Sequence, residues 1–474
     1  MTPRFPVWEV LDSYLDPALS PDPGRARTGT RRLFRDLIEP LSDSFLVRDR
    51  RLQQQLLARI VSRVRRLPEA QSFHEGLDRV GMDDEDAVVD RARRLAGMKT
   101  EALPRRVRRV LIPSRVTLGA DLLLAGPIVR TCLDALPNAE IVFLGSRKNA
   151  GLIAADSSRF RIRELSYPRR GSLLERMLAW VDLMDAVNEE ILGLSADREL
   201  IVINPDSRFL QSGLLPLVPP GREAGSYFGW DPSVSGKETE ERSQLEDLNR
   251  WLREMFRSHP PNPLRGPSLH LEDSVRRRAK EMLASLNPGR DPVLVGMNLG
   301  VGGNPDKRIH RNRESVSDFE RLLVTGLLDQ GATLVLDAGL GRDELEQARR
   351  LYLEIGERGH GTARIAGGRL LRDDPGTLPV RLVLFHGPVD EFGALLEQCR
   401  IYVGYDSLGQ HLAGALNLDL VTVFGGHASP LFARRWRPGG SGRIQVIESG
   451  PGPFGTRRQA VLAGQVLAEA RALL

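Results

Sequence analysis

The stretch that decides the fold is IYVGYDSLGQHLAGALNLDLVTVFGG, residues 401–426. An apolar run ending at Tyr405 is typical of a strand, a polar turn follows it, and small residues open a helix before a second apolar run at 420–426. In a parallel α/β sheet this succession places a helix N-terminus at the carboxyl edge, where backbone N–H groups and the helix dipole favour phosphate. The residues expected beside a bound ligand are Asp406, Ser407, Gly409 and His411.

These polar residues also have a second interpretation. Asp406 and Ser407 precede the helix, and either side chain could cap its first turn without excluding contact with a sugar hydroxyl. His411 falls in the first turns of the same helix, and a histidine that stands alone is more often structural than functional. Both interpretations stay open at the level of the sequence.

The same alternation of strand and helix extends over residues 108–474 and predicts βαβ units around buried parallel sheets. A Pro-rich break at 258–268 separates two stretches of this kind. We therefore predict an α/β fold with two Rossmann-like lobes. Strands are expected at 110–113, 140–145, 199–204, 292–300, 332–339, 381–387, 401–406 and 420–426. Helices are expected at 121–136, 172–194, 237–257, 316–330, 344–355, 395–398 and 459–474.

Residues 1–105 form a helical, Arg-rich N-terminal extension in this prediction. Within it, residues 51–66 carry an apolar stripe at helical spacing with arginines and glutamines on the other face. Such a helix can lie on a membrane or a partner, but packing against its own domain is the favoured interpretation. The predicted domains are the extension 1–105, an N-terminal lobe 106–260 on the acceptor side, and a C-terminal lobe 270–474 on the donor side.

Composition limits the class of protein. The chain has 474 residues, 41% of them hydrophobic and 27% charged, which is typical of a soluble globular protein with two or three domains. No run of eighteen apolar residues or signal peptide is evident, so we expect a cytoplasmic protein. The net charge of +5 is a slight bias that indicates an Arg-rich solvated surface and no nucleic-acid partner. Cys132 and Cys399 form no metal-binding or disulfide pattern.

A second candidate site lies in the Gly-rich loop GMNLGVGGNPDKRIHRNRE, residues 296–314. Glycines let the backbone approach a diphosphate closely, and Lys307 would place a point charge on it. Lys307 is one of only five lysines in an otherwise Arg-rich chain, which favours a specific role over a solvated surface position. The residues predicted to bind the donor here are Gly302, Gly303, Lys307 and Arg308, with Arg311 a weaker candidate.

Three segments together resemble glycosyltransferase family 9, the ADP-heptose:lipopolysaccharide heptosyltransferases. The turn at 405–426 matches the family's D-S-G-x-x-H…F-G signature, with Leu408 intervening before the glycine and Asp419 near the family's customary proline. The loop at 296–314 matches its Gly-rich loop and Lys-Arg pair. The matching residues of the signature are Asp406, Ser407, Gly409, His411, Ala413, Ala415, Phe424 and Gly425.

The third segment, residues 114–145, resembles the family's opening motif. Counting back from Pro127 places Asp121 where the family carries its catalytic carboxylate, with the preceding glycine displaced by one position to Gly119. The resemblance thus implies that Asp121 is the general base that takes the proton of the acceptor hydroxyl. An N-cap is the alternative role for an aspartate at a helix start.

The resemblance covers residues 108–474 and implies a GT-B fold, with two lobes that face a cleft. It further implies an enzyme that transfers heptose or a related sugar from a nucleotide diphosphate sugar to a cell-envelope glycan or glycolipid, with inversion. No metal or other cofactor is expected, because Lys307 and the helix N-terminus at 406–411 would stabilise the leaving diphosphate. Asp206 and Arg208, on the loop after the strand at 199–204, are predicted to contact the acceptor, with a capping turn as the alternative. Peripheral contact with the inner face of the membrane stays open.

Two rival functions stay open. One is a nucleotide-sugar epimerase with the same two lobes, which would convert its donor without any acceptor. The other is a non-catalytic sugar- or nucleotide-binding protein on a degenerate GT-B scaffold. A dinucleotide oxidoreductase is disfavoured, because no G-x-G-x-x-G follows the first strand of either lobe.

Overall fold

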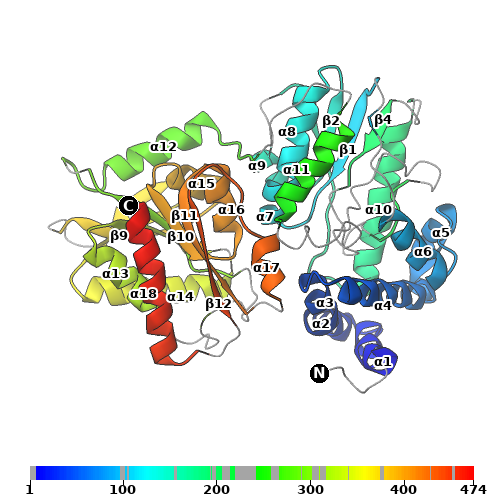
Figure 1. The fold of residues 1–474 in the computed structure, drawn as a ribbon, viewed down its shortest axis with the longest axis horizontal. Coiled ribbons are helices and arrows are strands. Elements are labelled where there is room, and N and C mark those ends of the chain that lie inside the picture. Colours follow the sequence, from blue (N-terminus) through cyan, green and yellow to red (C-terminus); the bar gives the residue numbers. More distant parts are fainter. Residues whose placement is uncertain are drawn as a thin grey trace. The chain divides into compact units, whose positions relative to one another are not determined.

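The structure is a computed structural model. The residues that it describes are 7–96, 102–103, 106–153, 157–192, 194, 199–204, 214–218, 242–257, 266–289, 291–301, 309, 316–339, 341–373, 378–426, 429–450 and 454–474. The chain divides into two compact units (Figure 1). The first unit consists of Met1–Arg265 with Ala428–Trp436, and the second of Gly266–His427 with Arg437–Leu474.

The first unit is built on a four-stranded sheet in the order β3-β2-β1-β4, and every neighbouring pair is parallel. Its strands are β1 (Arg109–Pro113), β2 (Glu140–Gly145), β3 (Phe160–Glu164) and β4 (Leu200–Val202). The central strands β1 and β2 are apolar and almost wholly buried, as a sheet covered on both faces requires. The edge strand β3 was not predicted from the sequence, because it alternates arginines with apolar residues and is only partly buried.

The helices that follow these strands agree with the predicted βαβ pattern. They are α7 (Leu118–Ala120), a π-helical turn (Asp121–Ala125), α8 (Gly126–Ala135), α9 (Arg147–Ile153), α10 (Leu173–Ile191) and α11 (Gln244–Met255). The long helix α10 begins with a capping box, in which the Ser172 hydroxyl accepts from the backbone N–H of Glu175 and the Glu175 carboxylate accepts from the N–H of Ser172.

The N-terminal extension is helical, as predicted, and lies within the first unit. Its helices are α1 (Val7–Ala18), α2 (Pro23–Leu33), a π-helical turn (Phe34–Ile38), α3 (Glu39–Asp43), α4 (Val47–Arg65), a 3₁₀ turn (Pro68–Ala70), α5 (Gln71–Arg79) and α6 (Glu85–Ala96). One continuous core joins their apolar side chains, among them Leu57 and Phe73, to Leu111 of β1 and Trp180 of α10. Phe73 meets Trp180 edge to face, with ring centroids 5.6 Å apart. The apolar stripe of α4 therefore packs on its own unit, which confirms the favoured interpretation.

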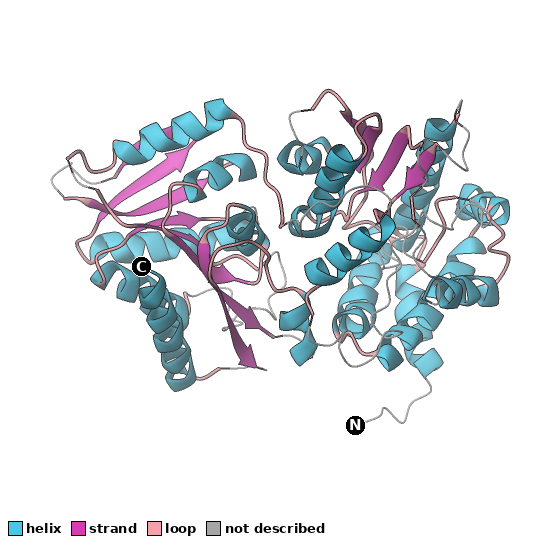
Figure 2. Cartoon of the chain, turned by 45° about the horizontal axis from the view of Figure 1, so that its top comes forward, coloured by secondary structure: helices cyan, strands magenta, loops and turns pink. Residues whose placement is uncertain are grey.

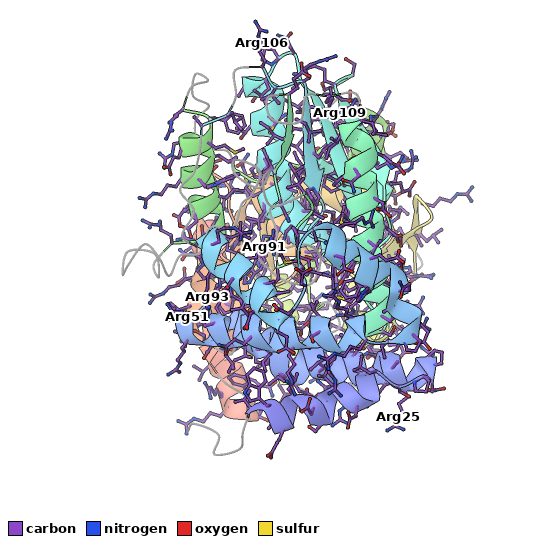
Figure 3. The ribbon with its side chains drawn as sticks, turned by 90° about the vertical axis from the view of Figure 1, so that its right-hand side faces the viewer. Arg25, Arg51, Arg91, Arg93, Arg106 and Arg109 are labelled. Atoms are coloured by element: carbon purple, nitrogen blue, oxygen red, sulfur yellow. The ribbon has the colours of Figure 1, made fainter. Side chains whose placement is uncertain are left out.

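The arginines of this extension have two environments (Figure 3). Arg25, Arg51 and Arg93 are exposed, whereas Arg91 is 2% exposed and donates to the carbonyl oxygen of Leu214. The Arg-rich composition thus supplies both a solvated surface and an internal hydrogen bond. No helix in the described part of the chain combines the length and the apolar character that crossing a membrane requires.

The second unit is built on an eight-stranded sheet in the order β12-β11-β10-β5-β6-β9-β7-β8. All neighbouring pairs are parallel except β7 and β8, which form an antiparallel pair at the edge. The strands are β5 (Leu294–Asn298), β6 (Thr333–Asp337), β7 (Gly361–Ala366), β8 (Arg369–Arg372), β9 (Val380–His386), β10 (Ile401–Tyr405), β11 (Asp419–Gly425) and β12 (Ile444–Gly450). Each predicted strand of this half is confirmed. The short hairpin β7–β8 and the partly exposed edge strand β12 were not predicted from the sequence.

Helices cover both faces of this sheet (Figure 2). They are α12 (Asp273–Ala284), α13 (Asp318–Asp329), α14 (Arg342–Glu357), α15 (Val389–Leu396), α16 (Leu408–Ala415) and α18 (Thr456–Leu473). The core on one face joins Phe319 of α13, Leu351 of α14 and Val466 of α18 to the buried side chains of the strands. The α/β fold with two parallel sheets is therefore confirmed.

Helix α17 (Pro430–Arg435) belongs to the first unit, although its sequence lies between β11 and β12. A buried ion pair holds it there, between Arg435, whose side chain is 5% exposed, and Asp247 of α11, which is 1% exposed. Asp247 also accepts from Arg242 at 3.1 Å, and the Arg435 guanidinium lies 5.4 Å from the ring centroid of Phe45.

Replacing Asp247 by Ala is expected to destabilise the first unit by about 3–5 kcal/mol, because the change leaves the Arg435 charge buried without its carboxylate. Urea unfolding measures the free-energy difference. The control is Asp185→Ala, which removes the carboxylate from an exposed ion pair with Arg79 and is expected to cost at most about 1 kcal/mol. Equal losses in the two variants would contradict a structural role for the buried pair.

Candidate functional site

The second sheet contains a topological switch point between β5 and β10. From β5 the chain continues to β6 on one side, and later returns to place β10 on the other side of β5. Ligands of open α/β sheets bind at the carboxyl ends of the strands where the order reverses in this way. Three polar residues stand at this edge: Asn298 ends β5, Asp337 ends β6, and Ser407 follows β10.

Asn298 joins these three strand ends by hydrogen bonds. Its Oδ1 accepts from the Ser407 hydroxyl at 3.1 Å and from the backbone N–H of Gly300 at 3.0 Å. Its Nδ2 donates to Oδ2 of Asp337 at 2.6 Å, and the N–H of Gly339 donates to Oδ1 of Asp337 at 3.1 Å. Asn298 and Asp337 were not predicted as site residues from the sequence. Each is a polar residue at the end of an apolar strand, and this pattern could have indicated them.

Ser407 is the N-cap residue of α16, but its side chain makes no capping hydrogen bond. The hydroxyl donates to Asn298 instead, so the capping interpretation of Ser407 is wrong. The N–H groups of the first turn of a helix have no intrahelical acceptor, and here the N-cap side chain does not satisfy them either. The N-terminus of α16 can therefore offer backbone donors to an anion at the switch point.

Asp406 precedes this turn, and Gln410 and His411 belong to it. Gln410 donates from Nε2 to Oδ1 of Asp406 at 2.7 Å, and its Oε1 accepts from the Thr422 hydroxyl of β11 at 2.7 Å. His411 is 5% exposed, with its Nε2 3.4 Å from Nε2 of Gln410. The structure thus brings Asp406, Ser407 and His411 together at one strand end, while their contact with a ligand stays a prediction.

Packing requires a glycine at position 409, for a reason that the sequence did not reveal. A Cβ atom at this position would lie 2.2 Å from the hydroxyl oxygen of Tyr402, and one at Gly404 would lie 2.4 Å from it. Tyr402 is fully buried on β10. Both glycines therefore make room for this ring, whatever the turn binds.

Glu344, in the first turn of α14, holds the start of the Gly-rich loop. Its Oε1 accepts from the N–H of Val301 at 2.9 Å, and its Oε2 accepts from the N–H of Gly341 at 3.2 Å. Burial and, to a smaller extent, the charge of Glu344 raise the pKa of the neighbouring Asp337 to about 6, although the hydrogen bonds from Gly339 and Asn298 oppose this. The predicted donor residues Gly302, Gly303, Lys307 and Arg308, together with Arg311, lie outside the described residues.

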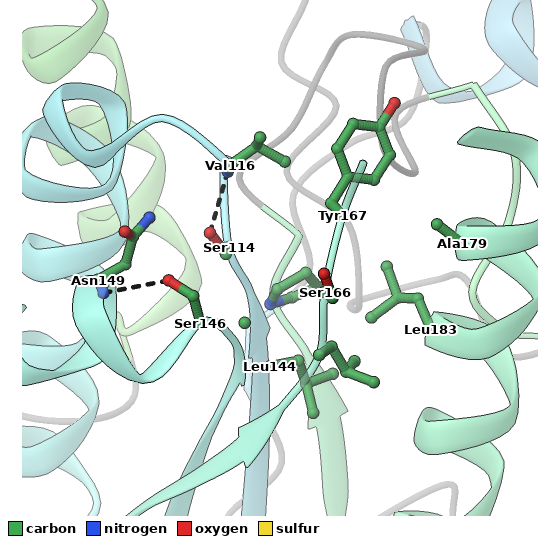
Figure 4. Close-up of a pocket in the computed structure, with 12 residues that line it drawn as sticks. Ser114, Val116, Leu144, Ser146, Asn149, Ser166, Tyr167, Ala179 and Leu183 are labelled. Carbon is green, nitrogen blue, oxygen red and sulfur yellow. Dashed lines mark hydrogen bonds between the residues drawn. The ribbon is translucent and has the colours of Figure 1, made fainter. Parts of the chain in front are cut away.

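The first sheet has a pocket of about 170 Å³ at the carboxyl ends of β1, β2 and β3 (Figure 4). It lies at the edge where βα loops gather in a parallel sheet, and α10 closes one side. The residues that line it are Pro113, Ser114, Val116, Leu144, Gly145, Ser146, Asn149, Leu165, Ser166, Tyr167, Ala179 and Leu183. The predicted acceptor residues Asp206 and Arg208 lie outside the described residues.

Asp121 lies behind the wall of this pocket and is 0% exposed. Its Oδ2 accepts from the Ser114 hydroxyl at 2.7 Å and from Nδ2 of Asn149 at 2.6 Å, and its Oδ1 accepts from the N–H of Arg115 at 2.5 Å. Asp121 does not cap a helix start, because its own N–H already donates to the carbonyl of Thr117 at 2.9 Å. The N-cap alternative is therefore wrong. Burial raises the pKa of Asp121 to about 6, although the three hydrogen bonds oppose this.

The π-helical turn Asp121–Ala125 is where Asp121 enters the helix. Such turns insert one residue into an α-helix and rotate the residues that precede it relative to those that follow. The one-residue displacement of Gly119 from Asp121, noted in the sequence, occurs at this insertion. Helix α8 and Pro127 continue in regular geometry beyond it.

The raised pKa of Asp121 predicts a specific pH dependence of stability. The folded chain holds this proton more tightly than the unfolded chain, whose Asp pKa is about 3.9. The contribution to stability is therefore complete below about pH 4 and is lost as pH rises through about 6, a change of about 3 kcal/mol. The free energy of unfolding of the wild type minus that of Asp121→Asn is expected to fall by this amount between pH 4 and pH 7.5.

Urea unfolding at the two pH values tests this expectation. Asp185→Asn serves as the control, since the Asp185 side chain is 49% exposed. Its difference from the wild type is expected to change little with pH. A difference for Asp121→Asn that stays constant or grows with pH would show that the buried carboxylate is not destabilised by ionisation.

Comparison with known proteins gives a likeness in structure alone. No protein-family model matches the chain, and no curated protein matches its sequence. A glycosyltransferase family 9 structure from Veillonella parvula matches 79% of this chain and 99% of its own, with 14% identity and a TM-score of 0.54. E. coli ADP-heptose LPS heptosyltransferase II has 16% identity, coverage of 77% and 98%, and a TM-score of 0.46. E. coli heptosyltransferase WaaC with ADP has 16% identity, coverage of 77% and 100%, and a TM-score of 0.47. The chain has the two-sheet α/β fold of GT-B glycosyltransferases and is similar in structure to glycosyltransferase family 9.

Proposed function

We propose that this protein is a glycosyltransferase that moves a sugar from a nucleotide diphosphate sugar to an acceptor hydroxyl. The observation that carries the proposal is the switch point of the second sheet. There the Ser407 hydroxyl donates a hydrogen bond to Asn298, so the N-terminus of α16 has no side-chain cap. A helix N-terminus at such a point suits a diphosphate, because its N–H groups and dipole both favour negative charge.

The donor half of the proposal places the diphosphate on the first turn of α16. Lys307 and Arg308, with Gly302 and Gly303 beside them, would neutralise the charge that develops on the leaving nucleotide. Asp406 and His411 would contact the sugar or the phosphates. The resemblance of the sequence to family 9 supports heptose or a related sugar as the group transferred, and a cell-envelope glycan or glycolipid as the acceptor.

The acceptor half of the proposal gives Asp121 the role of general base. A carboxylate with a pKa of about 6 is ionised at neutral pH, and it is a stronger base than an ordinary aspartate. Ser114 lines the pocket and donates to Asp121, so the proton of the acceptor hydroxyl would pass to the Ser114 oxygen as the Ser114 proton passes to Asp121. Attack from the side opposite the leaving nucleotide would invert the anomeric centre, and no metal takes part. Asp206 and Arg208 would contact the acceptor.

Nucleotide binding tests the donor site. In calorimetry without added metal, one of ADP, UDP, GDP and CDP is expected to bind selectively. Asn298→Ala is expected to weaken that binding about tenfold, because one hydrogen bond that positions Ser407 is worth about 1.4 kcal/mol. Lys307→Ala is expected to weaken it as well. If none of the four nucleotides bound, the proposed function would be contradicted, and a non-catalytic protein on a degenerate GT-B scaffold would be favoured.

Asn287 provides the matched control for this experiment. It is a buried asparagine that bonds to Val380 at the start of β9, at the opposite edge of the same sheet. Asn287→Ala is expected to lower the stability of the second unit and to leave the dissociation constant unchanged. Equal weakening of nucleotide binding in both asparagine variants would show that the effect of Asn298 is general destabilisation.

Turnover tests the role of Asp121. Asp121→Asn is expected to reduce the rate at least about 100-fold while nucleotide binding survives, since a positioned base contributes about 10²–10⁴ to the rate. In the wild type the rate is expected to rise with pH through about 6, as Asp121 loses its proton. Unchanged turnover in Asp121→Asn would remove this carboxylate from the mechanism. Conversion of the donor without an acceptor, seen in product analysis, would favour the epimerase.

A further inference from the structure

The pocket at the carboxyl ends of β1, β2 and β3 has a size that limits what it can hold. Its volume is about 170 Å³. A protein cavity of roughly 150 Å³ accommodates one benzene ring. The pocket therefore admits a single ring-sized group and not a whole glycolipid or nucleotide.

The chemistry of the wall limits the ligand further. Leu144, Leu165 and Leu183 line the pocket with apolar side chains. Figure 4 shows Leu144 and Leu183 together with Ala179 of α10. Hydroxyl and amide groups stand on the rest of the wall, from Ser114, Ser146, Asn149, Ser166 and Tyr167. None of the described lining residues carries a charge. A phosphate or carboxylate here would lose its hydration without gaining a counter-charge from the wall, which is strongly unfavourable.

The polar side of the wall is fixed before any ligand arrives. The Ser114 hydroxyl donates to buried Asp121 and accepts from the N–H of Val116 at 2.9 Å. Asn149 donates from its side chain to the same carboxylate, and its N–H donates to the Ser146 hydroxyl at 3.2 Å. Figure 4 shows the bonds from Val116 to Ser114 and from Asn149 to Ser146. The wall therefore holds its donors and acceptors in one arrangement.

Val116 adds an independent observation. Its backbone has φ of 69°, in the left-handed region that a β-branched residue rarely occupies. Such a conformation is strained and persists only where surrounding interactions enforce it, most often at binding and catalytic sites. Here the bond to Ser114 holds the strained residue at the rim of the pocket.

We infer that this pocket binds an uncharged ring that has hydroxyl groups on one edge and an apolar face on the other. A neutral sugar unit and a phenolic ring share this chemistry. On the proposed transferase function, the ring belongs to the acceptor, so the part of the acceptor nearest Ser114 carries no phosphate or carboxylate. Asp121, through Ser114 and Asn149, is then also a positioning residue for the wall of the pocket.

Ligand-observed saturation-transfer NMR on the full chain, without any donor, tests the inference. The probes are phenyl β-D-glucoside and phenyl β-D-glucuronide, which differ by one carboxylate. The glucoside is expected to receive saturation, and the glucuronide to bind at least tenfold more weakly. Saturation concentrated on the sugar protons supports the inference, whereas saturation confined to the phenyl protons, a ring without hydroxyl groups, would overturn it. Equal binding of the two probes would overturn the neutral character of the site.

Two variants with substitutions in α10 test whether the saturation of the glucoside comes from binding in this pocket. Ala179→Phe places a ring into the cavity and is expected to abolish glucoside binding. Asn188→Phe adds the same ring at an exposed position of the same helix and is expected to change nothing. Lack of glucoside binding by the wild type, or full binding by Ala179→Phe, would overturn the assignment. Because no donor is present in this experiment, neither result would count against the nucleotide site. If none of the four nucleotides bound in calorimetry, the proposed transferase function would fail, and the ring could no longer be assigned to an acceptor.

Discussion

A parallel sheet must be buried on both faces, and this constraint determines how the whole chain is used. The central strands β1 and β2 of the first sheet are apolar on both sides, so both faces must be covered. The N-terminal helices share one core with the sheet and α10, through residues such as Leu57, Phe73 and Trp180. Once both faces are covered, the strand ends are the places where polar side chains can meet a ligand. Both candidate sites accordingly lie at carboxyl edges.

The two edges use the same chemical arrangement. In each unit a carboxylate, that of buried Asp121 or of half-buried Asp337, accepts hydrogen bonds from a backbone N–H group and from an asparagine, and its pKa is raised to about 6. A serine at a strand end completes each network, Ser114 in the first unit and Ser407 in the second. Burying such a group costs free energy, which the hydrogen bonds offset in part. These networks hold hydrogen-bond donors in fixed positions at the place where a substrate would bind.

These arrangements suit different ligands. The second edge offers helix N–H groups, which favour a diphosphate. The pocket of the first edge has an uncharged wall among its described residues, which favours a neutral ring. A transferase needs both, because its donor carries the charge of the leaving nucleotide and its acceptor must present a hydroxyl.

Much of the fold followed from local pattern. Apolar runs separated by amphipathic helices predicted the central strands and most helices of both sheets, because buried parallel strands are continuously apolar. The partly exposed strands β3, β8 and β12 gave no such signal. The turn at 405–409 between β10 and α16 was also predicted, since a strand, a polar turn and a helix of small residues form a contiguous motif.

The sequence by itself determined the α/β class, the two sheets and the positions of the principal turn and of Asp121. Only the tertiary structure decided what the polar residues do there. Ser407 bonds to Asn298, more than a hundred positions away in the chain, and does not cap its own helix. Gly409 makes room for Tyr402, and Asp121 is enclosed by Ser114 and Asn149. Strand and helix follow from periodicity within a short window, whereas hydrogen-bond partners and burial depend on which distant segments pack together.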